Sequence, residues 1–595
     1  MAELFNEKDK RTHYCGTLTE ANIGENVCVC GWVQRQRDLG ALIFIDLRDR
    51  TGVVQLAFDS ESDKALFETA FGVRSEFVLS AKGTVRMRDS INNNIPTGKI
   101  EIFVTDMKVL SAAKTTPFEI SDSKKAKDEL ALKYRYLDLR RPSLQNNIRL
   151  RHDIARIARE YYYENGFYEI ETPMMMKSTP EGARDYLIPS RVHKGSFYAL
   201  PQSPQIYKQL LMVAGYDRYI QIARCFRDED LRADRQPEFT QIDLEMSFAT
   251  QEDIMQMNEG FIKRLFKELL GIELENMPRM TYADAMNLYG SDKPDTRFDL
   301  KINDISSIVA NCGFGAFSTP IAEGGSVRAI VAKNAADKLT RKEIDKLTEH
   351  AKGIGAKGLA YIRWTEEAPN CSFAKFMTQD ELNAIYEALN LEKGDVALIC
   401  AGSNKIVLPV LGALRGIVAR KLDIIPKNKF NFLWITEFPF FEWDEESGTW
   451  AAMHHPFTMP LDECLEYLET DPGNVRAKAY DMVLNGIELL SGSIRITDWM
   501  LQEKMFNALG LTKEEIEAKF GFLVDAYKYG APPHGGSGMG LDRLAMVITE
   551  AESLRDVIAF PKVQNASEIM SACPSPVAKK DLDVLGIAVV EEEEK

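Results

Sequence analysis

The stretch from Ile222 to Met246 constrains the fold more than any other part of the chain, because two apolar runs there enclose a segment crowded with charge. In the second run, residues 239–248, polar and apolar residues alternate with the period of a half-buried strand, and the first run, residues 219–226, suits a partner strand. The loop between them is too long for a tight hairpin, and long loops on such scaffolds are usually functional or disordered. We therefore expect a strand pair that carries polar groups on one face and a charged loop at its end.

Composition limits the class of protein. At 595 residues the chain holds several domains, and its 45% hydrophobic and 27% charged residues are ordinary for a soluble globular protein. No apolar run reaches the roughly 18–20 residues of a membrane span, and the charged N-terminus has no signal-peptide core. Nine scattered cysteines without a C-x-x-C pair suit a reducing cytosol, so we expect a cytoplasmic protein without membrane association. A net charge of −16 argues weakly against nucleic-acid binding, although a basic face can exist on an acidic protein.

Residues 14–110 carry five short strand signals at close spacing, which predicts a small barrel. These signals are Val27–Val33, Leu42–Leu47, Val53–Phe58, Phe77–Val85 and Ile100–Val109. The second and third of them, with the end of the first, bring together cations, an aromatic ring and an amide, the mixture that reads unpaired RNA bases. The residues concerned are Arg35, Arg37, Phe44 and Gln55. A core position for Phe44 and a solvated face for the arginines explain the same composition equally well.

The middle of the chain divides by pattern. Residues 111–145 are polar and charged and look like a linker, and a helix is predicted from Asn147 to Glu164, with Gly166 as its stop signal. Four arginines of this helix lie largely off its apolar stripe, so we expect them on a solvated face: Arg149, Arg151, Arg156 and Arg159. Residues 291–430 have their own mixed strand and helix patterns and are numerous enough to form a domain.

Three short motifs carry a resemblance to a known family. Phe226–Glu229 (FRDE) resembles the F-R-x-E core of motif 2 in class II aminoacyl-tRNA synthetases. Residues 536–543 (GSGMGLDR) resemble motif 3, and residues 167–173 (FYEIETP) resemble motif 1, which ends in a proline at the dimer interface. A lone glycine-rich octet would be a weak signal, but the three motifs occur in the family's order. The closer resemblance is to the bacterial-type aspartyl-tRNA synthetases of subclass IIb, and it covers nearly the whole chain.

The resemblance implies a multidomain α/β and β fold with an N-terminal OB-fold barrel, a class II antiparallel-sheet catalytic domain and an α+β insertion domain. The implied boundaries are 1–112 for the anticodon-binding OB-fold, 113–145 for a hinge or linker, 146–290 for the catalytic part with motifs 1 and 2, 291–430 for the bacterial-type insertion, 431–562 for the catalytic part with motif 3, and 563–595 for a C-terminal extension with an acidic tail. The run from Arg35 to Asp46 resembles the family's anticodon-binding segment and favours the RNA-contact interpretation of the barrel.

The implied activity is that of an ATP-dependent ligase that joins L-aspartate to the 3′ end of tRNA-Asp, with ATP as substrate, Mg²⁺ as cofactor and a homodimer as the assembly. Asparaginyl and lysyl synthetases share the layout and stay as alternatives, as does an inactive paralogue. An amide substrate would not need two cations and a lysine substrate would need acids, so Lys208 with Arg495 favours aspartate. The intact Arg227 and Arg543 argue against an inactive paralogue.

The resemblance also assigns roles to single residues, and the residue types agree with them. Arg227 clamps the α-phosphate and the aspartate carboxylate, and Arg543 holds the γ-phosphate. The ATP contacts are Arg227, Asp228, Glu229, Gln236, Phe239, Glu488, Gly540, Leu541, Asp542 and Arg543. The aspartate contacts are Glu181, Ser203, Gln205, Ile206, Tyr207, Lys208, Arg227, Asp243, His454 and Arg495. Asp481 and Glu488 are the metal ligands.

Two positions bear on specificity and on fidelity to the family pattern. The position after Arg37-Asp38 is often histidine in relaxed family members, which also charge tRNA-Asn, and leucine in strict ones. Leu39, beside the expected anticodon readers, therefore predicts a strict enzyme, with a non-discriminating enzyme as the alternative. The family commonly has more glycine where this chain has Leu490-Ser491. The resemblance therefore does not predict the backbone conformation at Ser491.

Overall fold

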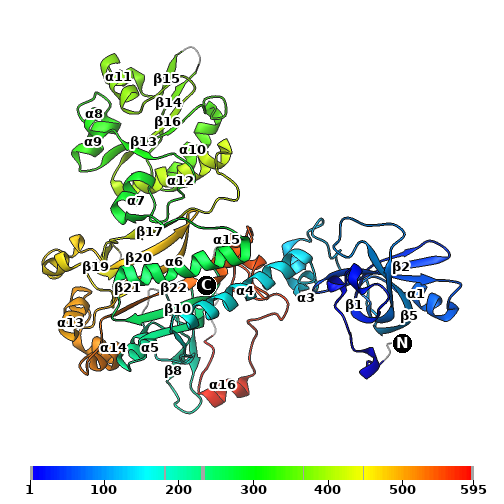
Figure 1. The fold of residues 1–595 in the computed structure, drawn as a ribbon. Helices are drawn as coiled ribbons and strands as arrows, with labels where there is room; N and C mark the ends of the chain where they lie inside the picture. The colour runs from blue at the N-terminus through cyan, green and yellow to red at the C-terminus, as the bar shows by residue number, and fades with distance from the viewer. Residues whose placement is uncertain (1–3, 180–182, 230–234, 366–367, 446–447, 591–595) are drawn as a thin grey trace. The chain divides into compact units, whose positions relative to one another are not determined.

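The structure is a computed structural model that describes residues 4–179, 183–229, 235–365, 368–445 and 448–590. The chain forms two compact units, Met1–Asn146 with Ile569–Ser571, and Asn147–Glu568 with Ala572–Lys595. Figure 1 follows the chain from blue at the N-terminus to red at the C-terminus. We describe each unit by itself.

The first unit is built on a closed five-stranded barrel in the order β1-β2-β3-β5-β4. Its strands are β1 (Asn26–Asp38), β2 (Leu42–Asp49), β3 (Gly52–Asp59), β4 (Val78–Met87) and β5 (Ile100–Ser111). Helix α1 (Lys64–Gly72) lies between β3 and β4 in the chain, and the side chain of Asp63 caps its first turn. Alternate residues such as Val29, Ile45 and Leu56 are fully buried inside the barrel. The predicted barrel and its five strands are confirmed.

The segment expected to be a linker is partly helical. It contains α2 (Asp128–Lys133) and α3 (Arg135–Asp138), and α4 (Pro142–Glu164) begins before the predicted start. Proline suits the first helical turn because its missing N–H is not needed there. Asp138 accepts hydrogen bonds from Arg135 at 2.7 Å and from Arg141 at 2.6 Å, and its own side chain is buried. The charges around Asp138 are therefore paired within folded structure.

The second unit is organised around an eight-stranded sheet in the order β11-β17-β20-β21-β22-β10-β9-β6. Its strands are β6 (Tyr168–Glu169), β9 (Arg218–Phe226), β10 (Glu238–Ser247), β11 (Arg279–Thr281), β17 (Phe432–Thr436), β20 (Ala479–Leu484), β21 (Ile487–Ile494) and β22 (His534–Gly540). The pairs are antiparallel except β11 with β17 and β6 with β9. Ile242 lies opposite Ile222 in the β9–β10 ladder, which confirms the strand pair predicted from the sequence.

Helices cover this sheet. One core joins Ile242 and Leu244 of β10 to α4, to α6 (Gln251–Leu270) and to α15 (Leu541–Ile548), and Figure 1 shows these three helices in front of the strands. Since side chains alternate along a strand, Asp243 and Glu245 project from the opposite face. Helix α5 (Gln205–Val213) contacts that face and packs with α13 (Trp499–Ala508) and α14 (Lys513–Tyr527) in a second cluster. The polar face of β10 is therefore covered by α5 and the helices that pack with it.

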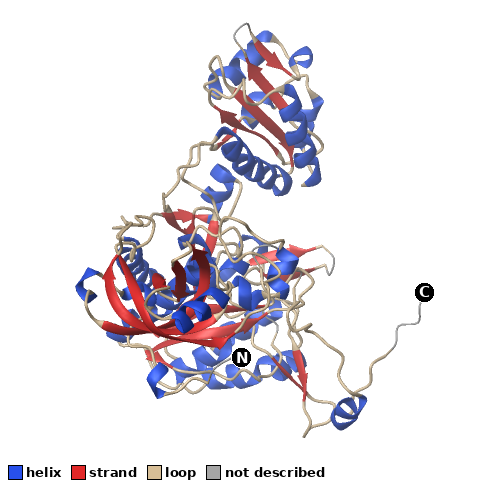
Figure 2. Ribbon diagram, turned by 90° about the vertical axis from the view of Figure 1, so that its right-hand side faces the viewer, coloured by secondary structure: helices blue, strands red, loops and turns tan. Residues whose placement is uncertain are grey.

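Residues 302–422 form a separate sheet in the order β12-β13-β16-β14-β15, all antiparallel. Its strands are β12 (Ile302–Asp304), β13 (Ser326–Ala332), β14 (Ala360–Trp364), β15 (Pro369–Cys371) and β16 (Val396–Gly402). One core carries α10 (Arg341–Gly353) and α12 (Asn404–Leu422) and the other α8 (Ser306–Val309), α9 (Gly315–Ala322) and α11 (Gln379–Ala388). Figure 2 shows helices on both faces of this sheet. The mixed strand and helix patterns predicted here are confirmed.

The remaining elements are short. They are α7 (Tyr282–Tyr289), α16 (Lys579–Leu585) and the strand pairs β7 (Leu187–Pro189) with β8 (Phe197–Ala199) and β18 (Phe441–Asp444) with β19 (Thr449–Ala452). The acidic tail, Glu591–Glu594, lies outside the described residues. Within the described part of the chain, every helix is too short or too polar to span a membrane.

Candidate active site

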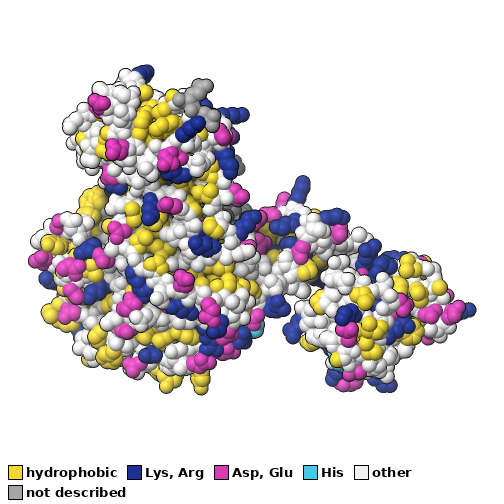
Figure 3. All heavy atoms as spheres, turned by 45° about the horizontal axis from the view of Figure 1, so that its top comes forward, with side chains coloured by type: hydrophobic (Ala, Val, Ile, Leu, Met, Phe, Trp, Pro, Cys, Tyr) yellow, Lys and Arg dark blue, Asp and Glu magenta, His cyan; other side chains and the backbone are white. Residues whose placement is uncertain are grey.

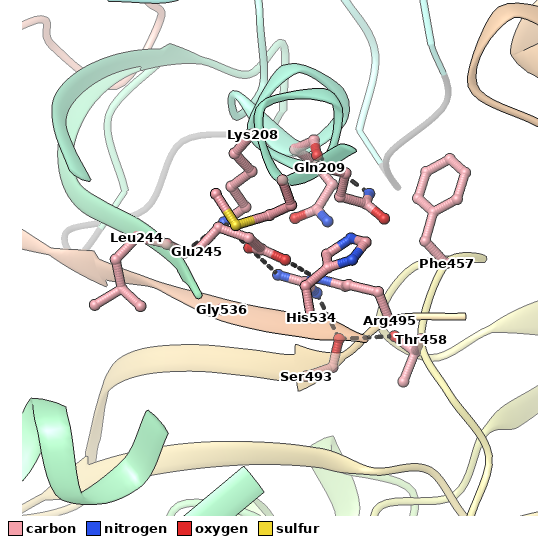
Figure 4. Close-up of polar contacts among 12 residues, drawn as sticks. Lys208, Gln209, Leu244, Glu245, Phe457, Thr458, Ser493, Arg495, His534 and Gly536 are labelled. Carbon is pink, nitrogen blue, oxygen red and sulfur yellow. Dashed lines mark hydrogen bonds and ion pairs between the residues drawn. The ribbon is translucent and has the colours of Figure 1, made fainter. Parts of the chain in front are cut away.

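A buried network of two cations and two anions lies on the polar face of β10. Lys208 Nζ on α5 is 2.8 Å from Asp243 Oδ1 and 3.4 Å from Glu245 Oε2. The guanidinium of Arg495 donates two hydrogen bonds to Glu245, at 2.8 and 3.0 Å. Figure 4 shows Lys208 from α5 and Arg495 from beyond β21 converging on the Glu245 carboxylate. The two cations that the sequence assigned to substrate binding are therefore brought to one place.

Glu245 is the functional candidate that sequence reasoning missed. Glu245 is fully buried, and burial by itself would raise the pKa of its carboxyl. The positive charges of Arg495 and Lys208 outweigh burial and lower that pKa. Burial raises the pKa of Asp243 to about 6, against the opposing influence of Lys208. The signal was present in the alternation of β10, because Asp243 and Glu245 are two residues apart and so share a face.

The glycine-rich run is the central strand β22, and its glycines make room for this network. A Cβ at Gly536 would lie 2.1 Å from both Oε2 of Glu245 and the backbone oxygen of Leu244. At Gly535 it would lie 2.7 Å from the side chain of Ile494. Gly536 pairs with Glu245 on one side and with Ser493 on the other, so the carboxylate lies over a strand without side chains.

The neighbouring histidines His454 and His455 lie in different surroundings. His455, rather than His454, is next to Arg495, with Nε2 2.6 Å from Nη1. Burial, and then the charge of Arg495, lower the pKa of His455 well below its usual range, so this ring is neutral. His454 lies 3.7 Å from Asp481, and although burial lowers the pKa of His454, the carboxylate outweighs it and raises that pKa. His454 thus lies with the carboxylates assigned to metal binding.

Arg543, Glu488 and Asp481 form a second polar group. Arg543 Nη1 is 3.0 Å from the backbone oxygen of Glu488 and 3.5 Å from its carboxylate. Burial, and then the negative charge of Asp481, raise the pKa of Glu488, and Oδ1 of Asp481 is buried without a hydrogen-bond partner. Two neighbouring carboxylates with free oxygen capacity match the donors that Mg²⁺ takes from protein when phosphates and water complete its shell. Among the described residues, no group of three or more His, Cys, Asp or Glu could hold a metal ion alone.

Arg227 stands at the end of β9 beside the ring assigned to adenine. Its guanidinium lies 5.3 Å from the centroid of the Phe239 ring, and its buried Nε has no hydrogen-bond partner among the described residues. The backbone N–H of Asp228 donates to Arg184, and Glu229 is 2.7 Å from Arg235. The charged loop beyond them, residues 230–234, lies outside the described residues.

Two residues assigned to ATP are engaged with the protein itself. The amide of Gln236 donates to the backbone oxygen of Lys562 at 3.1 Å and accepts from its N–H at 2.8 Å. Asp542 accepts from the N–H of Thr240 at 2.9 Å and is bound by Arg151. In this structure both side chains join chain segments that are far apart in sequence.

The solvated-face prediction for the α4 arginines is wrong for Arg151. Its side chain is 19% exposed and pairs with Asp542 on α15, because α4 and α15 pack in the same core. Arg156 and Arg159 agree with the prediction, since both are exposed and pair with Glu160 and Glu169. The sequence could not assign Arg151 a partner, because the carboxylate lies 391 residues away.

The other assigned residues are distributed around the network. Gln205 is buried, and within the described part of the chain its Nε2 has no hydrogen-bond partner, while Ser203 and Tyr207 are half-buried. Ile206 is fully buried in the cluster with Phe457. Glu181 lies outside the described residues.

The motif 3 residues and the departure from the family pattern have clear positions. Gly540 is the N-cap residue of α15, and Leu541 is buried in the sheet core. Leu490 and Ser491 continue β21 without a positive φ, directly after a bulge at Leu489 where the register with β20 shifts.

The barrel brings three of its assigned residues into one polar cluster. Arg37 donates to Asp46 at 2.7 Å and to Gln55 at 2.9 Å, and its guanidinium lies 5.8 Å from the Phe44 ring centroid. Arg35 is exposed, and Leu39 is 69% exposed in the turn between β1 and β2. Gln55 itself is buried and also donates to Glu101, so Arg37 and Phe44 are the members of this cluster that reach the barrel surface.

Comparison with known proteins decides the family. Residues 127–564 match the model of the tRNA synthetases class II (D, K and N), and residues 27–110 match an OB-fold nucleic acid binding domain. The chain belongs to the class II tRNA synthetases. This membership and the two observed sheets confirm the predicted fold class, an OB-fold barrel with a class II antiparallel catalytic sheet.

Curated relatives of this class II synthetase match over its full length. The chain is 56% identical to the aspartate–tRNA ligase of Ruminiclostridium cellulolyticum, over 98% of this chain and 99% of that protein. It is 54% identical to the aspartate–tRNA ligase of Agathobacter rectalis, covering 98% of each. It is also 54% identical to the aspartate–tRNA(Asp/Asn) ligase of Lachnoclostridium phytofermentans, covering 97% of each.

Solved structures of synthetases share the fold. The asparaginyl-tRNA synthetase from Pyrococcus horikoshii has a TM-score of 0.57 at 18% identity, covering 92% of this chain and 97% of that one. The aspartyl tRNA synthetase from Entamoeba histolytica has a TM-score of 0.55 at 18% identity, covering 91% and 89%.

Proposed function

We propose that this class II synthetase is an aspartate–tRNA ligase that activates L-aspartate with ATP and transfers it to tRNA-Asp. The observation that carries the proposal is the pair of buried cations, Lys208 and Arg495, on the polar face of β10. An acidic amino acid side chain needs such partners, whereas asparagine and lysine do not. The names of the full-length relatives support the same substrate.

In the first step, an α-carboxylate oxygen of aspartate attacks the α-phosphorus of ATP, and pyrophosphate leaves. No protein nucleophile is needed, because positioning of the reactants and neutralisation of their charge account for the rate enhancement. Arg227 clamps the α-phosphate and the carboxylate in this proposal, since the planar guanidinium matches both oxyanions. Arg543 holds the γ-phosphate, and Phe239 stacks on adenine. The unpartnered Nε of Arg227 supports this, because it retains a buried donor for substrate.

Asp481 and Glu488 would hold Mg²⁺ in this step. When bound, the ion neutralises phosphate charge and screens the repulsion between the nucleotide and the attacking carboxylate. Burial, and then the charge of the neighbouring Asp481, raise the pKa of Glu488, and two carboxylates close together are the electrostatic setting of an oxygen-ligand site. Arg543, beside Glu488, orients that carboxylate.

In the second step, the 3′-terminal hydroxyl of the tRNA attacks the carbonyl carbon of the adenylate, and AMP leaves. Selection of aspartate is complete before this step. Asp243 and Glu245 already pair with Lys208 and Arg495, so asparagine would lose the added attraction between a side-chain carboxylate and these two cations. Glu181, Ser203, Gln205 and Asp243 complete the site by receiving the substrate ammonium.

For the tRNA, we propose a strict enzyme that charges tRNA-Asp alone. The anticodons of tRNA-Asp and tRNA-Asn differ at one base, so the choice rests on the barrel surface. The exposed aliphatic side chain of Leu39 cannot hydrogen-bond a base edge, and it lies in the turn between β1 and β2, two residues after Arg37. A relaxed enzyme is the second candidate, which the Asp/Asn names of several relatives at 52–54% identity favour.

The proposed assembly is a homodimer through the motif 1 segment, acting in the cytoplasm. Strand β6 is the edge of the catalytic sheet, and edges need covering. Tyr168 on β6 is 63% exposed and contacts Tyr216, and Phe248 nearby in the adjoining loop is 75% exposed. Exposed aromatic side chains at a sheet edge support a protein interface. A cytoplasmic site of action agrees with free cysteines, eight of them buried or half-buried.

The test is ATP–pyrophosphate exchange with aspartate, asparagine and lysine in parallel. Exchange that depends on aspartate and Mg²⁺ is expected. Exchange with another amino acid alone would overturn the assignment. Mg²⁺ binding to Asp481 and Glu488 has a separate readout, because Asp481→Asn should weaken Mn²⁺ binding measured by electron paramagnetic resonance in the presence of ATP.

A further inference from the structure

A large cavity opens within the domain of residues 302–422, which the proposed reaction does not use. Its volume is about 810 Å³, within the range of small-molecule sites of about 300–1,000 Å³. Its walls are α9, the end of β16 with the start of α12, and the segment between α10 and β14. All lining residues lie between Phe314 and Ile406, so this cavity is made by one domain.

The cavity exists because the sheet opens at this corner. The β13–β16 ladder continues to Ser326 opposite Gly402, whereas the β14–β16 ladder ends at Ala360 opposite Ile399. Beyond Ile399, β16 therefore has a ladder partner on one side only. The chain that leads into β14 diverges from β16 instead of pairing with it, and the space between them is the cavity.

Six glycines line this space, which leaves backbone in place of side chains: Gly315, Gly324, Gly325, Gly355, Gly358 and Gly402. Gly355 and Gly402 have φ of +114° and +153°, which other residues rarely adopt. A Cβ at Gly358 would meet nothing within 4 Å. A flat ligand could therefore approach the backbone closely from several sides.

One wall is aromatic. Phe314 stacks on Phe373 with centroids 5.9 Å apart and ring planes within 11°, and on Phe376 at 4.9 Å and 15°. Phe317 packs edge-on against both Phe314 and Phe373. Figure 3 shows hydrophobic side chains at the surface of this domain, where Phe376 is 45% exposed. Phe317 and Phe373 are 2% and 1% exposed, so a planar heteroaromatic ring in the cavity would pack against the half-buried ring of Phe314.

The charges favour a ligand that carries phosphate. Lys357 is the one basic residue of the lining, it is exposed, and it has no ion-pair partner among the described residues. Glu323 on α9 is the one acidic residue of the lining. Residues 291–430 hold 20 Lys and Arg against 17 Asp and Glu in a chain of net charge −16, so this domain is locally basic.

We propose that this cavity is a nucleotide-binding site separate from the catalytic one. The base packs against Phe314, the ribose lies along the glycine backbone, and the phosphate pairs with Lys357. Either a free nucleoside monophosphate or an unpaired nucleotide of RNA presents this chemistry. The site is independent of the aspartate assignment, because it uses no residue of the polar face of β10.

The experiment blocks the catalytic site of the full-length enzyme with a non-hydrolysable aspartyl-adenylate analogue and titrates uridine, UMP and the trinucleotide UpUpU by calorimetry. Gly358→Leu fills the cavity, and Gly353→Leu is its matched control, because Gly353 ends α10 outside the lining and its Cβ would also meet open space. Lys357→Ala tests the phosphate contact, with the ion-paired Lys352→Ala as control.

We expect saturable UMP binding to the wild-type enzyme. Gly358→Leu should weaken this binding by at least about tenfold, because the new side chain fills a small site. Gly353→Leu should leave UMP binding unchanged. Lys357→Ala should weaken UMP by about threefold to tenfold and leave uridine unchanged, as for an exposed charge pair. If the ligand is part of RNA, UpUpU binds more tightly than UMP and Gly358→Leu raises the KM for tRNA. If it is a free nucleotide, UMP binds as tightly as UpUpU and the tRNA KM is unchanged.

Two results would overturn the proposal. One is the absence of saturable binding of UMP and UpUpU to the blocked wild-type enzyme. The other is binding that Gly358→Leu and Gly353→Leu affect equally. Aspartate-dependent pyrophosphate exchange in each variant, together with an unchanged circular dichroism spectrum, verifies that the chain is folded. Failure of exchange in the wild type would reject the proposed activity and leave the cavity result standing.

Discussion

Replacing Arg495 with methionine separates the folding role of the buried network from its substrate role. The change keeps an unbranched side chain of similar length but leaves Glu245 as a fully buried carboxylate without its bidentate partner. Breaking a buried ion pair from one side costs about 3–5 kcal/mol. Lys208, 3.4 Å from the same carboxylate, offsets part of this, so we expect the lower end of that range.

The effect on catalysis should be larger for aspartate than for ATP. If Arg495 also receives the side-chain carboxylate of aspartate, its loss removes about 2–5 kcal/mol of binding, which raises the KM for aspartate by about 30-fold to several thousand-fold. The KM for ATP should stay near that of the wild type, since no nucleotide role is proposed for Arg495. Pyrophosphate exchange measured over both substrates gives the two constants.

A double variant distinguishes the two roles. Glu245→Met with Arg495→Met removes both charges at once, and apolar replacement of a whole buried pair is often neutral or stabilising. The thermal transition should therefore return toward the wild-type value, while activation of aspartate stays lost. Arg156→Met is the control, because its pair with Glu160 is exposed and contributes about 0–1 kcal/mol.

Three outcomes would refute this reasoning. A single variant that melts like the wild type would mean that the buried charge of Glu245 finds another partner. A double variant that activates aspartate normally would remove Arg495 from the substrate site. Equal losses for aspartate and ATP would make its role structural alone.

Other perturbations test the rest of the site. Arg227→Ala should slow pyrophosphate exchange by more than about tenfold, because a charge-assisted clamp is lost; a smaller loss would place the clamp elsewhere. The pKa of Asp243 is about 6, so the KM for aspartate should rise as the pH falls through that value and the carboxylate loses its charge, and Asp243→Asn should show the high value at every pH from about 5 to 8. Gly536→Ala should destabilise the protein by several kcal/mol in thermal melts, since its Cβ meets a backbone oxygen at 2.1 Å, and a neutral effect would contradict the strand geometry. Leu39→His should raise charging of tRNA-Asn relative to tRNA-Asp in side-by-side aminoacylation, and an unchanged ratio would show that this position does not decide specificity.

The sequence by itself determined the elements whose signal is local. The alternation of residues 239–248 predicted β10, because a strand repeats every two residues and one face was apolar. The five barrel strands followed from the same rule and from short turns. The order of the three motifs predicted the family and the class II sheet, and the resemblance of further segments assigned roles to Lys208 and Arg495.

Only the tertiary structure decided which charges meet. Glu245 and Arg495 are 250 residues apart, and their pairing depends on the register of β10, β22 and β21, which places Glu245 and Ser493 on either side of Gly536. The same holds for Arg151 and Asp542, whose contact requires two helices to pack in one core. Local periodicity states which face of an element a residue occupies, but the partner on that face is chosen by the strand register and helix packing of distant segments. That is why the sequence identified the cations of this site, and the fold identified the carboxylate that holds them.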